Sequence, residues 1–157
     1  RISNELDLHR FETMQTFYNL CYREEEKEMF PFCKDQNIST LTYNPVAKGF
    51  LTGKYIRNEK NNNIRFKSDP ALSAKFFKSE DFDILEVVVQ IANEKGVKPA
   101  QVALAWLLDK NVTSPIIGAT KTSHVEEAVD SLNIKLSSDD IKRLEDPYQA
   151  QSIHHLD

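Results

Sequence analysis

The strongest candidate for chemistry in this chain is an aromatic residue followed by a glycine-containing turn. The segment from Tyr43 to Lys54 reads YNPVAKGFLTGK. A tyrosine ring at a strand end can stack on a flat ring, and the backbone N–H groups of such a turn can bind a pyrophosphate. The alternative is a surface turn that follows an ordinary core tyrosine. The turn is not a P-loop, because only three residues separate Gly49 from Gly53 and no Ser or Thr follows the lysine.

The cysteines and the paired histidines are weaker candidates. Cys21 and Cys33 form no C-x-x-C pair and have no His at ligand spacing, so neither zinc nor a disulfide framework is predicted. They are interpreted as reduced thiols of a cytosolic protein. His154 and His155 lie in a polar tail, where solvated side chains are the simpler interpretation, since two His without a third ligand make a weak metal site. No metal site is predicted.

Composition limits the class of protein. The chain has 157 residues, of which 40% are hydrophobic, enough for one domain with a core. Lys and Arg number 20 against 24 Asp and Glu, so no basic excess favours nucleic acid. No apolar run approaches the roughly 18 to 20 residues that a membrane span needs, and the first residues are not signal-like. We expect a cytoplasmic protein with neither nucleic acid nor membrane as partner.

The first third of the chain predicts two strands around a helix. Alternation over Phe11–Leu20 predicts a strand, and Arg23–Gln36 predicts a helix with Asn37 as a left-handed cap. Pro31 inside that helix predicts a kink or a late start. The β-branched run Ile38–Tyr43 predicts the second strand. The inner face of the helix is expected to contain Met29, Phe32 and Cys33.

The rest of the chain predicts a long loop, four helices and one more strand. Residues 46–79 are irregular, with Asn61, Asn62 and Asn63 in the middle, and a loop of that length is usually functional or disordered. Apolar residues at helical spacing predict a helix that stops at Gly96 and another that Pro99 opens. Residues 112–117 predict a third strand. Capping boxes then predict two more helices, at Ser123 with Glu126 and at Ser137 with Asp140, and the first of these has Val125, Ala128, Val129 and Leu132 on its apolar face.

The order β, α, β, loop, α, α, β, α, α indicates parallel βαβ units, and therefore an α/β fold. About three strands are present. A closed (β/α)8 barrel has eight strands and runs to roughly 250 residues, so a barrel would be incomplete here. Such a part of a barrel would have two open strand edges and a bare apolar face.

Four ordered segments resemble the aldo-keto reductases, especially the aryl-alcohol dehydrogenase-like branch. Residues 14–38 resemble the strand and helix before the cofactor loop, and residues 43–54 resemble that loop. Residues 97–129 resemble the final helix, strand and adenosine-binding turn, and residues 136–148 the closing helix. The resemblance implies that residues 1–157 form the C-terminal half of the reductase domain and of its (β/α)8 barrel. Residues 46–79 would then be a cofactor and substrate loop, and residues 149–157 a tail.

The resemblance also implies a cofactor, NADP(H), and the residues that bind it. Tyr43 would stack on the nicotinamide and Gln15 would contact its carboxamide. The pyrophosphate would be approached or covered, mostly through backbone N–H groups, by Asn44, Pro45, Val46, Ala47, Gly49, Leu51 and Lys54. The adenosine and its 2′-phosphate would be surrounded by Gly118, Thr120, Lys121, His124 and Glu127. In this set Lys121 is the candidate for the phosphate charge and Thr120 for a hydroxyl contact.

The chain departs from the family pattern at several of these positions. Tyr43 stands where this branch often has Trp, Asn44 where Ser is usual, and Lys98 where a capping Ser is common. Ala128 stands where an Asn commonly contacts adenine, and losing that amide would remove a hydrogen bond of about 1 kcal/mol. The family's catalytic Asp, Tyr, Lys and His belong to the first half of the barrel, so no catalytic residue is predicted in this chain.

Three hypotheses about function follow from the sequence. The first is a truncated NADP(H)-dependent reductase that transfers hydride between nicotinamide and an aldehyde or alcohol. The second is a non-catalytic relative that binds a dinucleotide or a partner protein. The third is a remnant that neither folds nor acts alone, which predicts aggregation or pairing with a complementary half.

Overall fold

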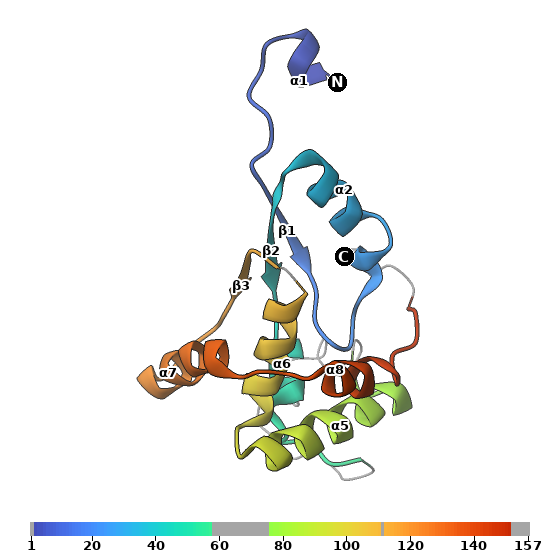
Figure 1. Ribbon diagram of the computed structural model, residues 1–157, viewed down its shortest axis with the longest axis vertical. Coiled ribbons are helices and arrows are strands. Elements are labelled where there is room, and N and C mark those ends of the chain that lie inside the picture. Colours follow the sequence, from blue (N-terminus) through green and yellow to red (C-terminus); the bar gives the residue numbers. More distant parts are fainter. Residues whose placement is uncertain (1, 58–75, 111, 152–157) are drawn as a thin grey trace.

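The computed structural model describes residues 2–57, 76–110 and 112–151 (Figure 1). The elements before residue 58 are α1 Ile2–Glu5, β1 Thr13–Phe17, the 3-10 helix η1 Glu24–Glu26, α2 Met29–Gln36, β2 Ser39–Tyr43 and the 3-10 helix η2 Ala47–Thr52. The later elements are α5 Ser79–Lys95, α6 Pro99–Asp109, β3 Ser114–Ile116, α7 Thr122–Asp130, the 3-10 helix η3 Ser131–Asn133 and α8 Ser138–Glu145. The asparagine run and the paired histidines of the tail lie outside the described residues.

A parallel sheet of three strands confirms the α/β prediction. The strand order is β1-β2-β3, with Phe17 in register with Tyr43, and Tyr43 in register with Ile116. Among the described residues β1 and β3 each pair with β2 alone, so both are edge strands. Pro115 in β3 suits an edge position, because proline has no backbone N–H to donate.

The core lies between the carboxyl ends of the strands and a layer formed by α5, α6 and α8 (Figure 1). The indole of Trp106 is fully buried and stacks on Tyr18 at 5.3 Å between ring centroids. Phe50, also fully buried, is surrounded by the rings of Tyr55, Phe76, Phe77 and Phe82. Because Phe50 belongs to η2, this aromatic cluster fixes the turn after β2 to the core.

Local signals predicted the helix ends well. Pro31 is the third residue of α2, so the predicted late start is confirmed, and Asn37 ends the helix at φ 59°. Pro99 opens α6 as predicted. The Ser137 hydroxyl accepts from the Asp140 N–H at 3.1 Å, which confirms that capping box. The capping box at Ser123 is wrong, because the N-cap of α7 is Lys121, two residues earlier, and the helix begins at Thr122.

The predicted inner faces of two helices are also wrong. On α2, Met29 is 38% exposed and Phe32 is 52% exposed, and only Cys33 is buried. On α7 no residue is buried, although Val125 and Val129 follow helical spacing. Periodicity identifies which face of a helix is apolar but does not show whether a neighbour covers it. Within the described chain Cys33 is covered and Ala128 is partly covered, whereas Met29, Phe32, Val125 and Val129 stay exposed.

No helix in the described part of the chain is both long and apolar enough to cross a membrane.

Candidate cofactor-binding site

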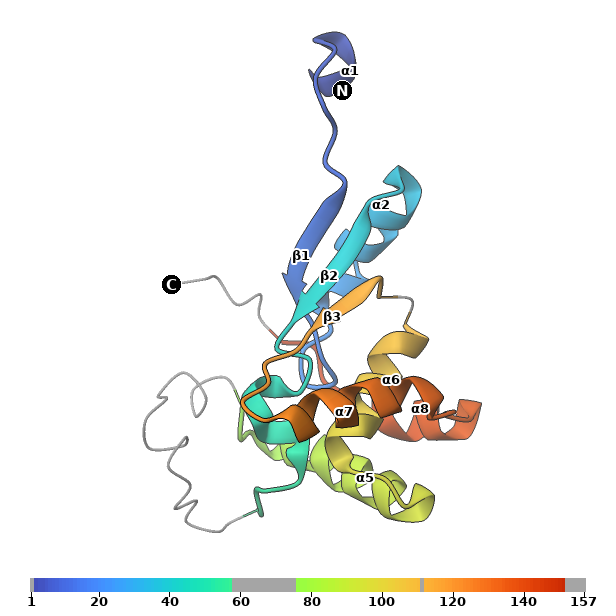
Figure 2. The same ribbon diagram turned by 90° about the vertical axis from the view of Figure 1, so that its left-hand side faces the viewer.

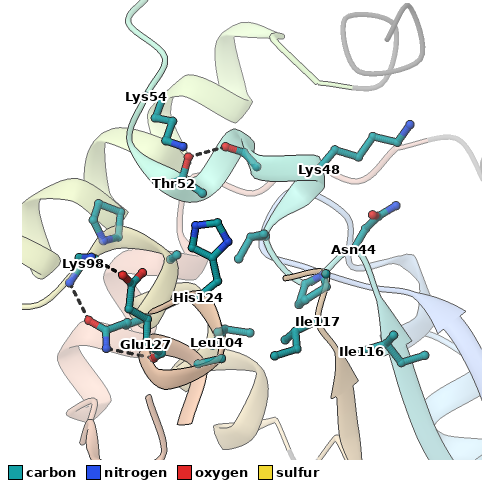
Figure 3. A pocket seen from close by; sticks show the side chains of 18 of the residues that line it. Asn44, Lys48, Thr52, Lys54, Lys98, Leu104, Ile116, Ile117, His124 and Glu127 are labelled. Atoms are coloured by element: carbon teal, nitrogen blue, oxygen red, sulfur yellow. Dashed lines mark hydrogen bonds and ion pairs between the residues drawn. The ribbon is translucent and has the colours of Figure 1, made fainter. Parts of the chain in front are cut away.

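A pocket of about 480 Å³ lies beyond the carboxyl ends of β2 and β3 (Figure 3). Its first wall is the turn after β2 with η2, from Asn44 to Tyr55. The second wall is the start of α6, from Lys98 to Gln101, together with Leu104. The third is the chain after β3, residues 116–118, and the fourth is α7. In α/β folds of this type the carboxyl ends of parallel strands are where ligands bind.

The turn after β2 has an unusual backbone. Asn44, Ala47 and Lys48 have φ angles of 55°, 49° and 55°, and Gly49 has 93°. The left-handed region is costly for Ala and Lys, so surrounding structure must hold the turn in place. The hydroxyl of Thr52 donates to the Gly49 carbonyl at 2.7 Å. The backbone N–H groups of Ala47, Gly49 and Leu51 donate hydrogen bonds to carbonyls within the turn. Ala47 and Leu51 are also fully buried.

Asn19, two residues after β1, holds this turn, and no local sequence pattern predicted it. Its side chain is fully buried, and Nδ2 donates to the Asn44 carbonyl at 3.1 Å. Its Oδ1 accepts from the Cys21 N–H at 2.9 Å. Both ends of the amide are therefore satisfied, and the contact spans 25 positions in sequence. Local patterns carry no information on a contact of that separation.

Gly53 joins two walls of the pocket. It has φ 78°, and a Cβ added there would lie 3.0 Å from the Pro99 Cγ at the start of α6. Any other residue at this position would strain the backbone at this φ angle, and its side chain would push η2 away from α6. The glycine therefore permits the close approach that forms the pocket.

Basic side chains dominate the charged lining. Lys48, Lys54, Lys98 and His124 line the pocket, whereas among the described residues Glu127 is the only acidic one in the lining. Figure 3 shows His124 between Glu127 on one side and Thr52 with Lys54 on the other. A hydrogen bond from the Lys98 ammonium lowers the pKa of Glu127, and the nearby charges of His124 and Lys54 lower it further.

The opposite part of the lining is apolar, with Val46, Leu104, Ile116, Ile117 and Ala128. A flat ring could pack against these side chains while an attached phosphate faces the lysines. The pocket volume also falls within the roughly 300–1,000 Å³ typical of small-molecule sites. The arrangement suits a ligand that combines an aromatic base with anionic groups.

The structure brings eight of the sequence-predicted residues together in this lining: Asn44, Pro45, Val46, Gly49, Lys54, Gly118, His124 and Glu127. Ala47 and Leu51 lie in the core behind the turn. Thr120 and Lys121 are exposed beside the pocket, and the Lys121 carbonyl accepts from the His124 N–H at 3.0 Å. The lining also includes the start of α6, which sequence reasoning missed even though Pro99 marks a helix amino end.

Gln15 and Tyr43 lie outside the pocket lining but share one face of the sheet. Tyr43 is in register with Phe17, and Phe17 follows Gln15 by two residues on β1. Side chains two residues apart on a strand point to the same face, so Gln15 and Tyr43 do so too. Gln15 is exposed, while the half-buried Tyr43 ring lies 5.4 Å from the ring of Phe17. A ligand that leaves the pocket along the end of β2 would reach Tyr43 first.

The tyrosines give no sign of an activated proton donor. Burial raises the pKa of Tyr18, Tyr43 and Tyr148, and neighbouring carboxylates raise it further. A tyrosine that acts as a general acid near neutral pH needs the opposite shift. We assign none of the three a catalytic role. Among the described residues no group of three or more His, Cys, Asp or Glu is placed to hold a metal ion.

Comparison with known proteins gives a consistent result. Residues 5–148 match the Aldo/keto reductase family. The versiconal hemiacetal acetate reductase of Aspergillus parasiticus is 37% identical over 149 residues, which cover 93% of this chain and 43% of that protein. A Schizosaccharomyces pombe protein named as an aryl-alcohol dehydrogenase is 39% identical over 140 residues, which cover 89% of this chain and 42% of the relative.

An aldo-keto reductase of Alternaria alternata is 38% identical over 147 residues, which cover 90% of this chain and 38% of that protein. The chain thus spans about two fifths of the length of these relatives. Its three parallel strands are part of a (β/α)8 barrel. The match over residues 5–148 shows that this chain belongs to the aldo/keto reductase family.

Proposed function

We propose that this chain is the cofactor-binding part of an NADP(H)-dependent oxidoreductase that acts on an aldehyde or alcohol. The observation that carries the proposal is the pocket at the carboxyl ends of β2 and β3. It combines an apolar wall with the side chains of Lys54, Lys98 and His124. The names of the relatives, which include reductases and a dehydrogenase, support the same class of reaction.

Each end of the dinucleotide has candidate residues. When bound, NADP(H) supplies or accepts the hydride. The turn from Asn44 to Gly49 and the ammonium of Lys54 would face the pyrophosphate. Gly118, Thr120, Lys121, His124 and Glu127 would surround the adenosine and its 2′-phosphate, and α7 adds the favourable dipole of a helix amino end. Tyr43 would stack on the nicotinamide, and Gln15, on the same sheet face, would contact its carboxamide.

Domain boundaries and location are proposals as well. Residues 1–157 would be the C-terminal half of the reductase domain, with residues 46–79 as its cofactor and substrate loop and residues 149–157 as a tail. A cytosolic location is supported by the two free cysteines, both of which are buried thiols.

A fluorescence titration of this chain with NADPH tests the cofactor proposal. Lys54→Ala is expected to weaken binding about tenfold, because it removes one charge-assisted contact to phosphate worth about 1.4 kcal/mol. Lys121→Ala is expected to reduce the affinity for NADPH to that for NADH, because only NADPH carries the 2′-phosphate. The control is Lys34→Ala, which removes an exposed lysine of α2 far from the pocket lining. Absence of a fluorescence change with the unaltered chain would contradict the proposal.

A complementary N-terminal half is the proposed partner, and an aldehyde or alcohol the substrate. Both outer strands have an open edge, and Val125, Val129 and Leu132 form an exposed apolar row that begins on α7. Strand edges and apolar rows of this kind are covered when a barrel closes. The catalytic Asp, Tyr, Lys and His that the resemblance implies would belong to that half.

Mixing experiments test the partner and the activity together. The amino-terminal part of a full-length relative, added to this chain, is expected to restore NADPH-dependent reduction of an aldehyde that neither part performs alone. A variant with Val129→Asp is expected to abolish the complex, because a charge would be buried at the contact. A stable complex that binds NADPH without turnover would favour the alternative of a non-catalytic relative.

A further inference from the structure

Gln101 is a buried polar residue that joins two walls of the pocket. It is 8% exposed and lies in the first turn of α6. Its Oε1 accepts from the Lys98 N–H at 3.0 Å and so caps its own helix. Its Nε2 donates to the backbone carbonyl of Glu127 on α7 at 3.0 Å. Both ends of one side-chain amide are thus used, one within α6 and one across to α7.

Little else among the described residues holds α7 in place. The helix buries no side chain completely. Ala128 packs partly buried against the core, while Val125 and Val129 are exposed. It crosses against α6 (Figure 2). Besides the Gln101 bond, the polar contact between the two helices is the Lys98–Glu127 ion pair. Lys98 is 63% exposed in its side chain, and exposed ion pairs contribute little, whereas a shielded hydrogen bond contributes more.

The position of α7 decides the shape of the pocket. His124, Glu127 and Ala128 form its α7 wall and face the turn that carries Gly49 and Lys54. If the Glu127 carbonyl loses its donor, α7 can move outward and the wall moves with it. A wider pocket would no longer contact both the base and the phosphates of one ligand.

We propose that Gln101 is a positioning residue that sets the distance between α7 and the turn after β2, and thereby the affinity for the adenosine end of the dinucleotide. The proposal rests on the proposed cofactor function for its ligand, although not for its structural part. Gln101 touches no reacting atom in this scheme and acts through α7.

Gln101→Glu separates the two bonds of the amide. The carboxylate keeps the acceptor for the Lys98 N–H but faces the Glu127 carbonyl without a proton to donate. At pH 8 the affinity for NADPH is expected to fall about tenfold, the fold-change that one shielded hydrogen bond represents. As the pH falls and the new carboxyl becomes protonated, its O–H can donate to that carbonyl. The NADPH affinity of Gln101→Glu, relative to that of the unaltered chain, should therefore rise again at lower pH.

Gln101→Met and Glu126→Gln are the matched variants. Methionine has similar length but neither donor nor acceptor, so it should weaken NADPH binding at every pH without recovery. Glu126→Gln changes an exposed residue of α7 outside the pocket lining and should change the affinity about twofold or less. A role of Gln101 in stability alone predicts no loss of NADPH affinity in folded Gln101→Glu at any pH. Equal affinity of Gln101→Glu and the unaltered chain across pH 5 to 8 would overturn the proposal.

Amide hydrogen exchange provides a readout that needs no ligand. In Gln101→Met the amides of α7 should exchange about tenfold faster, while those of α5 keep their rates. If the unaltered chain fails to bind NADPH, the cofactor proposal fails, and the exchange rates of α7 still decide the positioning role. Unchanged exchange in α7 would refute that role whether or not NADPH binds.

Discussion

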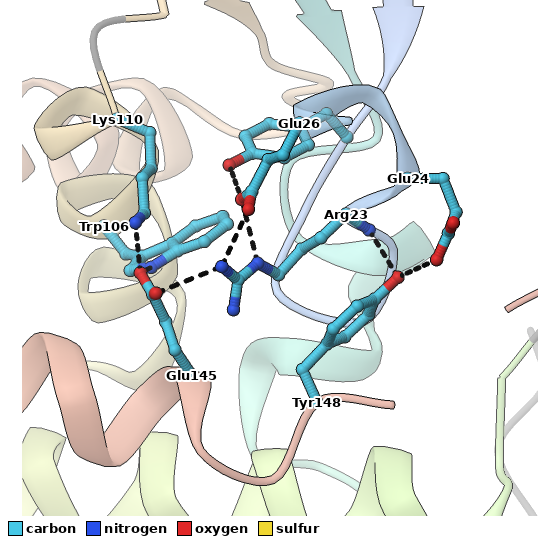
Figure 4. Close-up of polar contacts among 8 residues, drawn as sticks. Arg23, Glu24, Glu26, Trp106, Lys110, Glu145 and Tyr148 are labelled. Carbon is cyan, nitrogen blue, oxygen red and sulfur yellow. Dashed lines mark hydrogen bonds and ion pairs between the residues drawn. The ribbon is translucent and has the colours of Figure 1, made fainter. Parts of the chain in front are cut away.

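Arg23→Ala is expected to lower the free energy of unfolding by about 3 kcal/mol. The guanidinium donates to both oxygens of Glu26 at 2.8 Å and to Glu145 at 3.0 Å. It also lies over the rings of Trp106 and Tyr148, 5.6 and 5.2 Å from their centroids (Figure 4). Removing it leaves two partly buried carboxylates without their shared cation, and urea unfolding monitored by tryptophan fluorescence measures the loss.

Arg143→Ala is the matched control for that experiment. Arg143 also makes a two-pronged contact to a glutamate, with distances of 2.8 and 2.9 Å to Glu94. That glutamate is 44% exposed in its side chain, so solvent screens the pair and the expected loss is below about 1 kcal/mol. Equal losses for Arg23→Ala and Arg143→Ala would show that burial of the Arg23 contacts contributes nothing.

The Arg23 contacts are part of a larger polar network (Figure 4). The Tyr148 hydroxyl accepts from the backbone N–H of Arg23 at 3.0 Å and donates to the Glu24 carboxylate at 2.7 Å. The Gln151 N–H donates to the same Glu24 side chain at 2.8 Å. These bonds join η1 to the segment after α8. Because the Arg23 guanidinium also lies over the Tyr148 ring, the Arg23 variant should expose that segment to proteases.

Asp81→Asn is expected to remove a pH dependence of stability between about pH 4 and pH 6. Asp81 is 1% exposed, and its Oδ1 has no hydrogen-bond partner among the described residues. Burial raises the pKa of this carboxyl from 3.8 to about 6, although the Lys78 N–H, 3.0 Å from Oδ2, opposes the shift. The folded state therefore keeps a proton that the unfolded state has already lost, and stability falls as the pH rises through this range.

The pKa shift of Asp81 sets the size of this effect. It corresponds to a loss of about 3 kcal/mol in the free energy of unfolding between pH 4 and pH 6. Asparagine can still accept from the Lys78 N–H but does not ionise. The urea midpoint of Asp81→Asn should therefore change less than that of the unaltered chain between pH 4 and pH 6. Parallel pH profiles for the two proteins would contradict the assignment of this dependence to Asp81.

Asp140 offers a control with the opposite sign. It holds the same third position in the capping box of α8 and accepts from the Ser137 N–H at 2.8 Å. Burial alone would raise its pKa, but the Lys95 ammonium at 2.9 Å lowers it below the usual value. Its carboxylate therefore stabilises the fold above about pH 4 and stops doing so as the pH falls. Asp140→Asn should reduce stability at neutral pH.

Features encoded within a few residues were predictable from the sequence. Asn37 and Gly96 end helices with φ angles of 59° and 66°, and Pro99 opens one. Each signal acts through the residue's own backbone preference, so no distant contact is needed. The parallel pairing followed from alternating strands and helices, which indicate βαβ units.

Features that depend on distant neighbours were not predictable. The bond from Asn19 to Asn44 and the bond from Gln101 to Glu127 require knowledge of which segments meet. The exposure of Met29 on α2 and Val129 on α7 has the same cause, because burial is a property of a pair of surfaces. In the site, the resemblance supplied the turn after β2 and the residues after β3, whereas the wall contributed by α6 emerged only from the folded chain.

The uneven burial of the two sides of the pocket has a consequence for how such a site can evolve. On the side formed by the turn after β2, Ala47, Phe50 and Leu51 are fully buried, so most substitutions there also disrupt folding. On the α7 side no residue is buried. Mutations in α7 are therefore nearly neutral for stability and can accumulate. For the dinucleotide site proposed above, nucleotide preference could then diversify among descendants of this chain while the turn after β2 stays constant.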